Sequence, residues 1–142
     1  EAMRLGGAAF LLPNLRHEMA RDARRRLFTH TSAVRAVRES DGALVGMNDI
    51  RRRLNAYLLE CGGHIGYSVR KSERRKGYAK EMLAKALGIC RDLSIDKVLV
   101  TCDSRNEAPE RTILANGGVL ENVVPDEGHM TKRYWITVSG KV

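Results

Sequence analysis

The chain has 142 residues, of which 43% are hydrophobic, and 25 Lys and Arg against 17 Asp and Glu give a formal net charge of +8. This length fits one globular domain, expected over residues 1–142, because domains usually hold about 100 to 200 residues. The charge favours anionic partners such as nucleic acid, membrane phosphate or a phosphorylated cofactor, and does not choose among them.

The cysteines and the hydropathy pattern exclude several classes of protein. Cys61, Cys90 and Cys102 have the spacing of neither a zinc site nor a redox pair, so we expect reduced thiols and no metal. No stretch approaches the roughly 18 consecutive apolar residues that a membrane helix needs. We therefore expect a soluble, cytoplasmic protein with no membrane partner.

Residues 13–28 carry an apolar residue at every fourth position, which predicts one amphipathic helix. The stripe consists of Leu15, Met19, Ala23 and Leu27. The opposite face carries five arginines, at positions 16, 21, 24, 25 and 26. We interpret them as a solvated helix face, with nucleic-acid binding as the alternative.

A hairpin and a third strand are predicted next along the chain. Residues 32–39 and 44–54 have strand patterns, and the Asp41-Gly42 pair between them is typical of a hairpin turn. Residues 55–63 form a connection that ends in two glycines. Residues 64–70 then alternate, with Ile65, Tyr67 and Val69 on one face, which predicts the next strand.

The second half of the sequence predicts a crossover followed by a hairpin. Helical spacing from residue 78 to residue 93 is followed by an apolar strand over 97–102, an order typical of a parallel connection. A short helix over 107–116 should stop at Gly117-Gly118. Strands over 119–124 and 130–138 complete a mixed α/β fold with a largely antiparallel central sheet and one parallel β-α-β crossover.

The most informative segment is the run Arg74-Arg75-Lys76-Gly77-Tyr78-Ala79, which lies between the predicted strand and the long helix. Backbone amides at a helix N-terminus form an anion site, and a glycine there allows a phosphate to approach. The run therefore predicts phosphate binding. It contains neither the Walker sequence nor the three spaced glycines of a dinucleotide fingerprint.

The form R-x-x-G-x-A of this run resembles the acyl-coenzyme A pyrophosphate loop of the GNAT N-acetyltransferase superfamily. Residues 106–118 are similar to the family's N-x-x-A-x-x-L-Y-x-x-x-G-F segment, and residues 64–70 are similar to its fourth strand. The resemblance covers about residues 34–138. It implies an enzyme that transfers an acetyl group from acetyl-CoA to a primary amine of a small molecule or peptide by direct attack.

The resemblance also implies a set of cofactor-binding residues. Backbone groups of Val69 and Arg70 would pair with the pantetheine arm and hold the thioester carbonyl. Asn106 would hydrogen-bond the pantetheine or order its loop. The pyrophosphate would bind the Arg74 side chain and the amides of Arg75, Lys76, Gly77, Tyr78 and Ala79.

The match departs from the family pattern at several points. Ile113 stands where the family has a tyrosine that often protonates the leaving thiolate. Because isoleucine has no titratable group, it cannot act as this acid. Pro109 replaces an alanine and Gly118 a phenylalanine. The family's first strand is not found ahead of the predicted helix over 13–28.

His64 and Asp103 are the candidate catalytic residues. His64 has a side chain that titrates near 6.5 and could accept the proton of the amine, the alternative being a histidine that satisfies local hydrogen bonds. Asp103 could orient the amine or, as the alternative, cap the following loop. Asp49 is a weaker third candidate, whose alternative is to pair with an arginine.

Two further kinds of group could take part in the chemistry. The hydroxyls of Tyr67 and Tyr78 could replace the missing acid, although their apolar spacing favours core packing. Cys102 could carry an acetyl-cysteine intermediate, but its position in a strand favours a buried structural thiol.

Two other functions stay open from the sequence. A basic nucleic-acid-binding module would explain the net charge, but the chain has only two Phe, one Trp and four Tyr and no RNA-recognition aromatic motif. A non-catalytic acyl-CoA sensor would explain Ile113. The expected partners are acetyl-CoA and an amine-bearing substrate, and the sequence leaves open whether the protein forms a homodimer.

Overall fold

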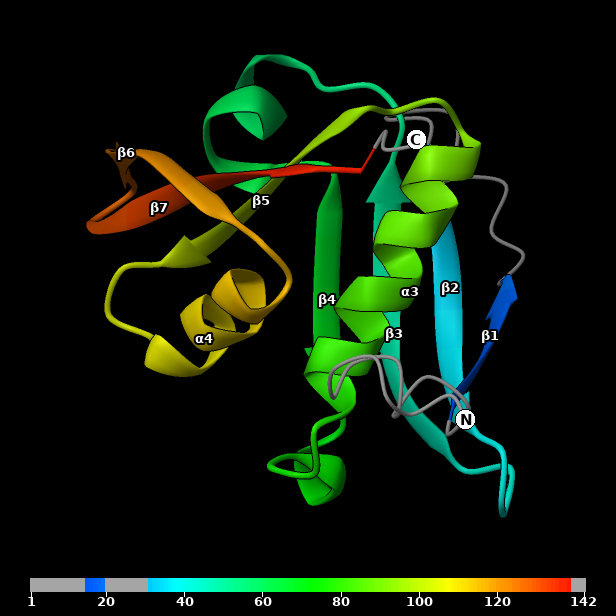
Figure 1. Ribbon diagram of the computed structural model, residues 1–142. Helices are drawn as coiled ribbons and strands as arrows, with labels where there is room; N and C mark the ends of the chain where they lie inside the picture. Colours follow the sequence, from blue (N-terminus) through cyan, green and yellow to red (C-terminus); the bar gives the residue numbers. More distant parts are fainter. Residues whose placement is uncertain (1–14, 20–30, 139–142) are drawn as a thin grey trace.

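The computed structural model describes residues 15–19 and 31–138, which form two antiparallel sheets and two main helices (Figure 1). A four-stranded sheet has the order β1-β2-β3-β4, and a three-stranded sheet has the order β5-β7-β6. The elements are β1 Leu15–Met19, β2 Thr31–Arg38, β3 Leu44–Arg51, η3 Leu58–Gly62, β4 Ile65–Val69, η4 Lys71–Glu73, α3 Tyr78–Asp92, β5 Lys97–Asp103, α4 Glu107–Ala115, β6 Val119–Asp126 and β7 His129–Thr137.

The helix predicted over 13–28 is wrong at its start, because Leu15–Met19 is strand β1 and pairs antiparallel with β2. Residues four apart share a face in a strand as well as in a helix, so the apolar stripe fits both structures. Its continuation at Ala23 and Leu27 lies outside the described residues. The first strand of the sheet is therefore found inside the segment predicted as helical.

The predicted hairpin of β2 and β3 is confirmed. The Arg38 amide donates to the Ala43 carbonyl at 2.8 Å, and Gly42 has the positive φ of 73° that the turn requires. Asp41 accepts a hydrogen bond from the Ala43 amide at 3.0 Å. This closed turn fixes the register of β3, which in turn pairs with β4.

Helix α3 lies across one face of the four-stranded sheet (Figure 1). Its apolar stripe is buried, as the helical spacing predicts, and burying each large side chain contributes about 1.5–3 kcal/mol. The buried positions are Glu81, Met82, Leu83, Ala86, Leu87 and Cys90. The Glu81 carboxylate accepts a hydrogen bond from the Leu15 amide at 2.9 Å, which ties α3 to β1.

Strand β4 precedes α3 in the sequence and strand β5 follows it, and these two strands belong to different sheets. The predicted single central sheet is therefore divided into two. The two strands meet only near their upper ends in Figure 1, where the His64 amide donates to the Leu99 carbonyl at 2.8 Å. The Leu99 amide donates to His64 Nδ1 at 2.9 Å. Beyond this junction the two strands diverge, and the crossover therefore surrounds an opening.

The C-terminal elements follow the sequence prediction within one or two residues. Helix α4 ends before Gly117, whose φ is 89°, and Ile113 is fully buried in the core beneath it. The β6–β7 turn uses Glu127 and Gly128, both with positive φ. No helix in the described ranges is long and apolar enough to cross a membrane.

Candidate functional site

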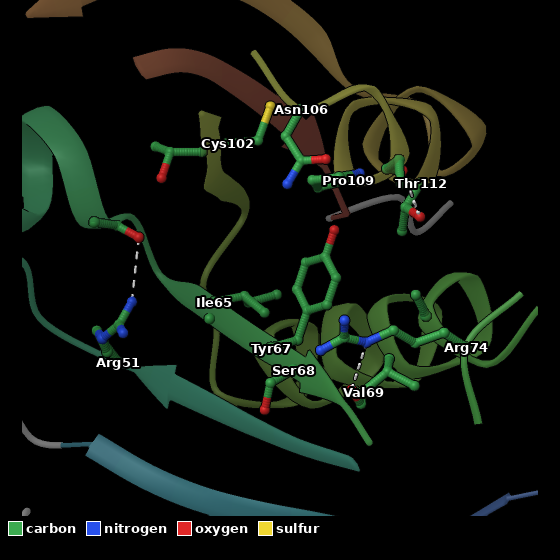
Figure 2. Close-up of a pocket in the computed structure, with 15 residues that line it drawn as sticks. Arg51, Ile65, Tyr67, Ser68, Val69, Arg74, Cys102, Asn106, Pro109 and Thr112 are labelled. Atoms are coloured by element: carbon green, nitrogen blue, oxygen red, sulfur yellow. Dashed lines mark hydrogen bonds between the residues drawn. The ribbon is translucent and has the colours of Figure 1, made fainter. Parts of the chain in front are cut away.

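A cleft of about 560 Å³ opens where β4 and β5 diverge, with the first turns of α4 as its third wall (Figure 2). A second hollow of about 370 Å³ continues from it to the N-terminus of α3. The two share the lining residues Val69, Arg74, Ala79, Ala108 and Thr112. Together they form one channel from the strand junction to the predicted phosphate loop.

The edge of β4 that faces the cleft presents backbone groups that do not pair with β3. Arg51 donates its amide to His64 O, and Arg70 donates its amide to Val45 O at 2.7 Å. Because alternate residues of an antiparallel strand point to opposite neighbours, the amides of Tyr67 and Val69 point away from β3. The Arg70 amide is committed to β3, so of the two predicted residues Val69 supplies the donor at the cleft.

The predicted phosphate loop has the backbone geometry of an anion site. Arg75 and Gly77 have φ of 64° and 86°, and α3 begins at Tyr78 directly after this left-handed turn. The amides of the first helical turn have no carbonyl partner within the helix, and the positive end of the helix dipole adds to their field. Arg74, Arg75, Gly77, Tyr78 and Ala79 all line the second hollow.

Two ion pairs and one hydrogen bond hold the loop in place. The Glu73 carboxylate contacts Arg38 of β2 at 2.6 Å and Lys76 at 3.1 Å, and the Arg38 hydrogen bond, followed by that of Lys76, lowers the pKa of Glu73. Arg74 Nε donates to the Val69 carbonyl at 3.0 Å (Figure 2). The Lys76 side chain is therefore directed toward Glu73 and does not line the channel.

Asn106 lies at the cleft as the resemblance implies. It precedes the first residue of α4, makes no side-chain cap, and presents its amide side chain between β5 and α4 (Figure 2). Its backbone amide donates to the Asp103 carbonyl at 3.0 Å, which sets the bend between β5 and α4.

His64 lies at the strand junction and is not among the described residues that line the channel. Its side chain is 9% exposed, Nδ1 accepts the Leu99 amide, and the ring packs edge-on against Trp135. Burial lowers its pKa below the usual 6.5. These contacts give His64 a structural role. Its action as a general base stays a prediction, and it would have to use Nε2, because Nδ1 already accepts the Leu99 amide.

The buried, neutral His64 predicts a pH-dependent stability. Because its pKa is lower in the folded state, its contribution is complete above pH 6.5 and is lost as the pH falls below that value. Between about pH 7 and 5, the free energy of unfolding of His64→Gln should fall less than that of the wild type. Urea titrations check this, and equal pH slopes for both proteins would contradict it.

Asp103 has the capping geometry that was its alternative role. Its carboxylate accepts three hydrogen bonds from Arg105, from the amide at 2.9 Å, Nε at 3.0 Å and Nη2 at 2.8 Å. The Arg105 side chain holds the pKa of Asp103 well below its usual range, which makes it a poor base. Neither Asp103 nor the half-buried Asp49 lines the channel.

Tyr67 and Cys102 line the larger part of the channel. Burial raises the pKa of the Cys102 thiol, which keeps it neutral and a weak nucleophile. Tyr67 extends from β4 across the cleft toward α4 (Figure 2). Its alternation with Ile65 and Val69 in the sequence favours core packing. In the structure, the face of β4 that carries these three side chains borders a cleft because β4 diverges from β5.

Membership of a family follows from a comparison with known sequences. The Acetyltransferase (GNAT) domain matches residues 6–119 of the chain. The chain belongs to the GNAT acetyltransferase family. The expectation of an acyltransferase with this fold is confirmed, and no curated protein matches the sequence.

Solved structures of GNAT acetyltransferases share the fold. The spermidine/spermine N-acetyltransferase SpeG from Vibrio cholerae, in complex with manganese ions, is 12% identical with a TM-score of 0.71, and the match covers 89% of this chain and 94% of that one. An acetyltransferase from Bacillus subtilis in complex with CoA is 11% identical, with a TM-score of 0.67 and coverage of 87% and 99%. The putative acetyltransferase yncA from Salmonella typhimurium, with its cofactor acetyl-CoA, is 14% identical, with a TM-score of 0.62 and coverage of 80% and 68%.

The donor set of this GNAT enzyme offers no metal centre in the part of the chain that the structure describes. No group of three or more His, Cys, Asp or Glu side chains is close enough there to hold an ion. The manganese belongs to the Vibrio cholerae structure.

Proposed function

We propose that this enzyme transfers the acetyl group of acetyl-CoA directly to a primary amine of a small molecule or peptide. The observation that carries the proposal is the continuous channel that joins the α3 N-terminus to the outward-facing amide of Val69. One end suits a pyrophosphate and the other an extended chain that pairs with a strand edge.

The residues of the channel have distinct parts in this reaction. The first-turn amides of α3 and the Arg74 guanidinium bind the phosphates, and the Tyr67 and Val69 backbone holds the pantetheine. The Val69 amide donates to the thioester oxygen and stabilises the negative charge that develops there as the amine attacks. The oxygen of the Val69 carbonyl fixes Arg74 beside this amide.

The attacking amine must first lose a proton, because a lysine-like amine has a pKa near 10.4. The larger part of the channel contains no residue with a base's properties, since Cys102 is held neutral and His64 and Asp103 lie outside it. The Glu73 carboxylate lies in the second hollow and is paired with Arg38 and Lys76. We therefore assign the proton to water in the open channel.

The charges on the larger part of the channel bear on the acceptor. Its described lining includes the cations Arg51 and Arg74 and no carboxylate side chain. Arg51 Nη1 donates to the carbonyls of Gly62 and Gly63 at 3.2 and 3.1 Å, beside the strand junction. A polyamine carries further ammonium groups that these cations repel, so an amine in a neutral or acidic molecule is the better-supported acceptor.

Acetyl-CoA incubated with a panel of spermidine, amino acids and acidic and basic peptides tests the function, with mass spectrometry of the products. We expect acetylated amines, with acidic or neutral acceptors preferred over spermidine. Coenzyme A binding without any acetylated product would instead support the acyl-CoA sensor. Intact-protein mass spectra without acceptor should show no acetyl group on Cys102, and an acetylated Cys102 would overturn direct attack.

A further inference from the structure

A hydrogen-bond donor to the sulfur atom would stabilise the charge that forms as the thioester breaks, and Ile113 does not provide one. Ile113 is fully buried among core residues and does not line either part of the channel. The residue beside it, Thr112, faces the cleft instead. A hydroxyl near Thr112 would therefore lie on the core side of the cleft, where it could donate a hydrogen bond to the leaving sulfur.

Tyr67 places such a hydroxyl there. In Figure 2 its phenol points from β4 toward Thr112, Pro109 and Asn106 across the cleft. The oxygen is shielded from solvent and makes no hydrogen bond of normal geometry within the described residues, although the Thr112 side chain lies near enough to lower its pKa slightly against the effect of burial. A buried hydroxyl without a good partner is uncommon in native proteins, so this one is suited to a partner that arrives with the ligand.

The position of Tyr67 along β4 agrees with the path of the pantetheine. The phosphates lie at the α3 N-terminus, and the arm runs from there along the open edge of β4, passing Val69 before Tyr67. The atoms that follow the second amide of the arm end in the sulfur. The sulfur and the thioester carbonyl bonded to it therefore lie together between the Val69 amide and the Tyr67 ring.

We propose that the Tyr67 hydroxyl donates a hydrogen bond to the coenzyme A sulfur and stabilises the departing thiolate, an inference that rests on the proposed acetyl transfer. The amine nitrogen forms the new bond to the carbonyl carbon, and its extra proton passes to water. The carbon–sulfur bond then breaks with its electron pair on sulfur. The thiolate later takes a proton from water, so protons and charge balance.

The acidity of the phenol separates hydrogen bonding from full proton transfer. Burial raises the pKa of Tyr67 to about 12, whereas a free thiol has a pKa near 8.5. The phenol is thus neutral at physiological pH and holds its proton more tightly than the thiolate would. It acts as a hydrogen-bond donor to the sulfur, and solvent supplies the proton.

Tyr67→Phe tests the proposal, since it keeps the ring and removes only the hydroxyl. We expect kcat to fall about tenfold to hundredfold, the usual value of a hydrogen bond to a charged group, with the KM for acetyl-CoA unchanged. The matched control is Tyr57→Phe, whose exposed ring lies outside the channel and donates to Asp126. The control should keep wild-type kcat, and thermal melting checks that both variants fold.

A second measurement needs no turnover. Coenzyme A alone is bound to each protein, and thiolate absorbance is followed against pH, with the coenzyme-free protein subtracted to remove Cys61, Cys90 and Cys102. A donated hydrogen bond lowers the pKa of the bound thiol, so Tyr67→Phe should raise it by about one to two pH units, the same tenfold to hundredfold preference. The Tyr57→Phe complex should match the wild type.

The outcomes separate this inference from the proposed function. Unchanged kcat and thiol pKa in Tyr67→Phe overturn the role of Tyr67 while acetyl transfer stands. A raised KM with unchanged kcat also overturns it, because the phenol would then be only a wall of the channel. If the wild type binds coenzyme A but acetylates nothing, acetyl transfer fails and the thiol pKa still decides the hydrogen bond.

Discussion

Replacing Gly63 with alanine is expected to lower the free energy of unfolding by about 2–4 kcal/mol, from backbone strain and overpacking together. Gly63 has φ of 76° and ψ of −179°, a region that essentially only glycine adopts. A Cβ at this position would lie 2.6 Å from the Leu99 carbonyl oxygen, closer than real Cβ contacts occur. That oxygen is the acceptor of the His64 amide, so the methyl group would push apart the junction of β4 and β5.

The matched control for Gly63→Ala is Gly42→Ala in the β2–β3 turn. Gly42 has a similar φ of 73°, and a Cβ there meets nothing within 4 Å. This control keeps the cost of a positive φ, about 1–2 kcal/mol, and omits the collision. Urea unfolding monitored by circular dichroism measures both variants, and equal losses of stability would show that the contact with Leu99 is unimportant.

The parts of the fold that could be predicted from the sequence are those set by local signals, and the junction of β4 and β5 is not one of them. The β2–β3 turn, α3 and the α4 terminus depend on local signals, namely Asp41-Gly42, helical spacing and Gly117, and all are confirmed. The two sheets are joined at one end by two hydrogen bonds between His64 and Leu99, which are 35 residues apart. No local pattern reports such a contact.

Strand β1 shows a second kind of limit. The spacing of Leu15 and Met19 is the same for a helix and a strand, so periodicity alone does not distinguish them over five residues. The decision comes from partners elsewhere in the chain, because β2 supplies the ladder and Glu81 accepts the Leu15 amide. A short segment that contacts distant residues is thus less predictable than α3.

The candidate site also has one part that local sequence predicts and another that depends on the folded arrangement. The predicted phosphate loop is contiguous in sequence, and the structure confirms the helix start predicted after Gly77 and adds a left-handed turn before it. Catalytic assignments depend on where side chains point after folding. His64 and Asp103 carry suitable chemistry but make their contacts outside the channel, whereas Tyr67 has an apolar strand pattern and lies inside it.

Replacing Gly77 with valine is expected to weaken coenzyme A binding about tenfold to hundredfold, since losing one hydrogen bond to a charged group costs about 1.5–3 kcal/mol. Gly77 has φ of 86° immediately before α3, and a β-branched residue strongly disfavours that conformation. The loop would change its turn, and the amides of Tyr78 and Ala79 would no longer point to one anion. Isothermal titration with coenzyme A measures the loss.

Gly128→Val separates this effect from general strain. Gly128 has φ of 88°, nearly that of Gly77, and lies in the β6–β7 turn with open space around it. Its valine variant should lose comparable stability while keeping wild-type affinity for coenzyme A. Equal affinities for Gly77→Val and Gly128→Val would mean that the α3 N-terminus does not hold the phosphates. A selective loss in Gly77→Val would tie the pyrophosphate to the turn that starts the helix, because only there do strain and anion binding involve the same backbone.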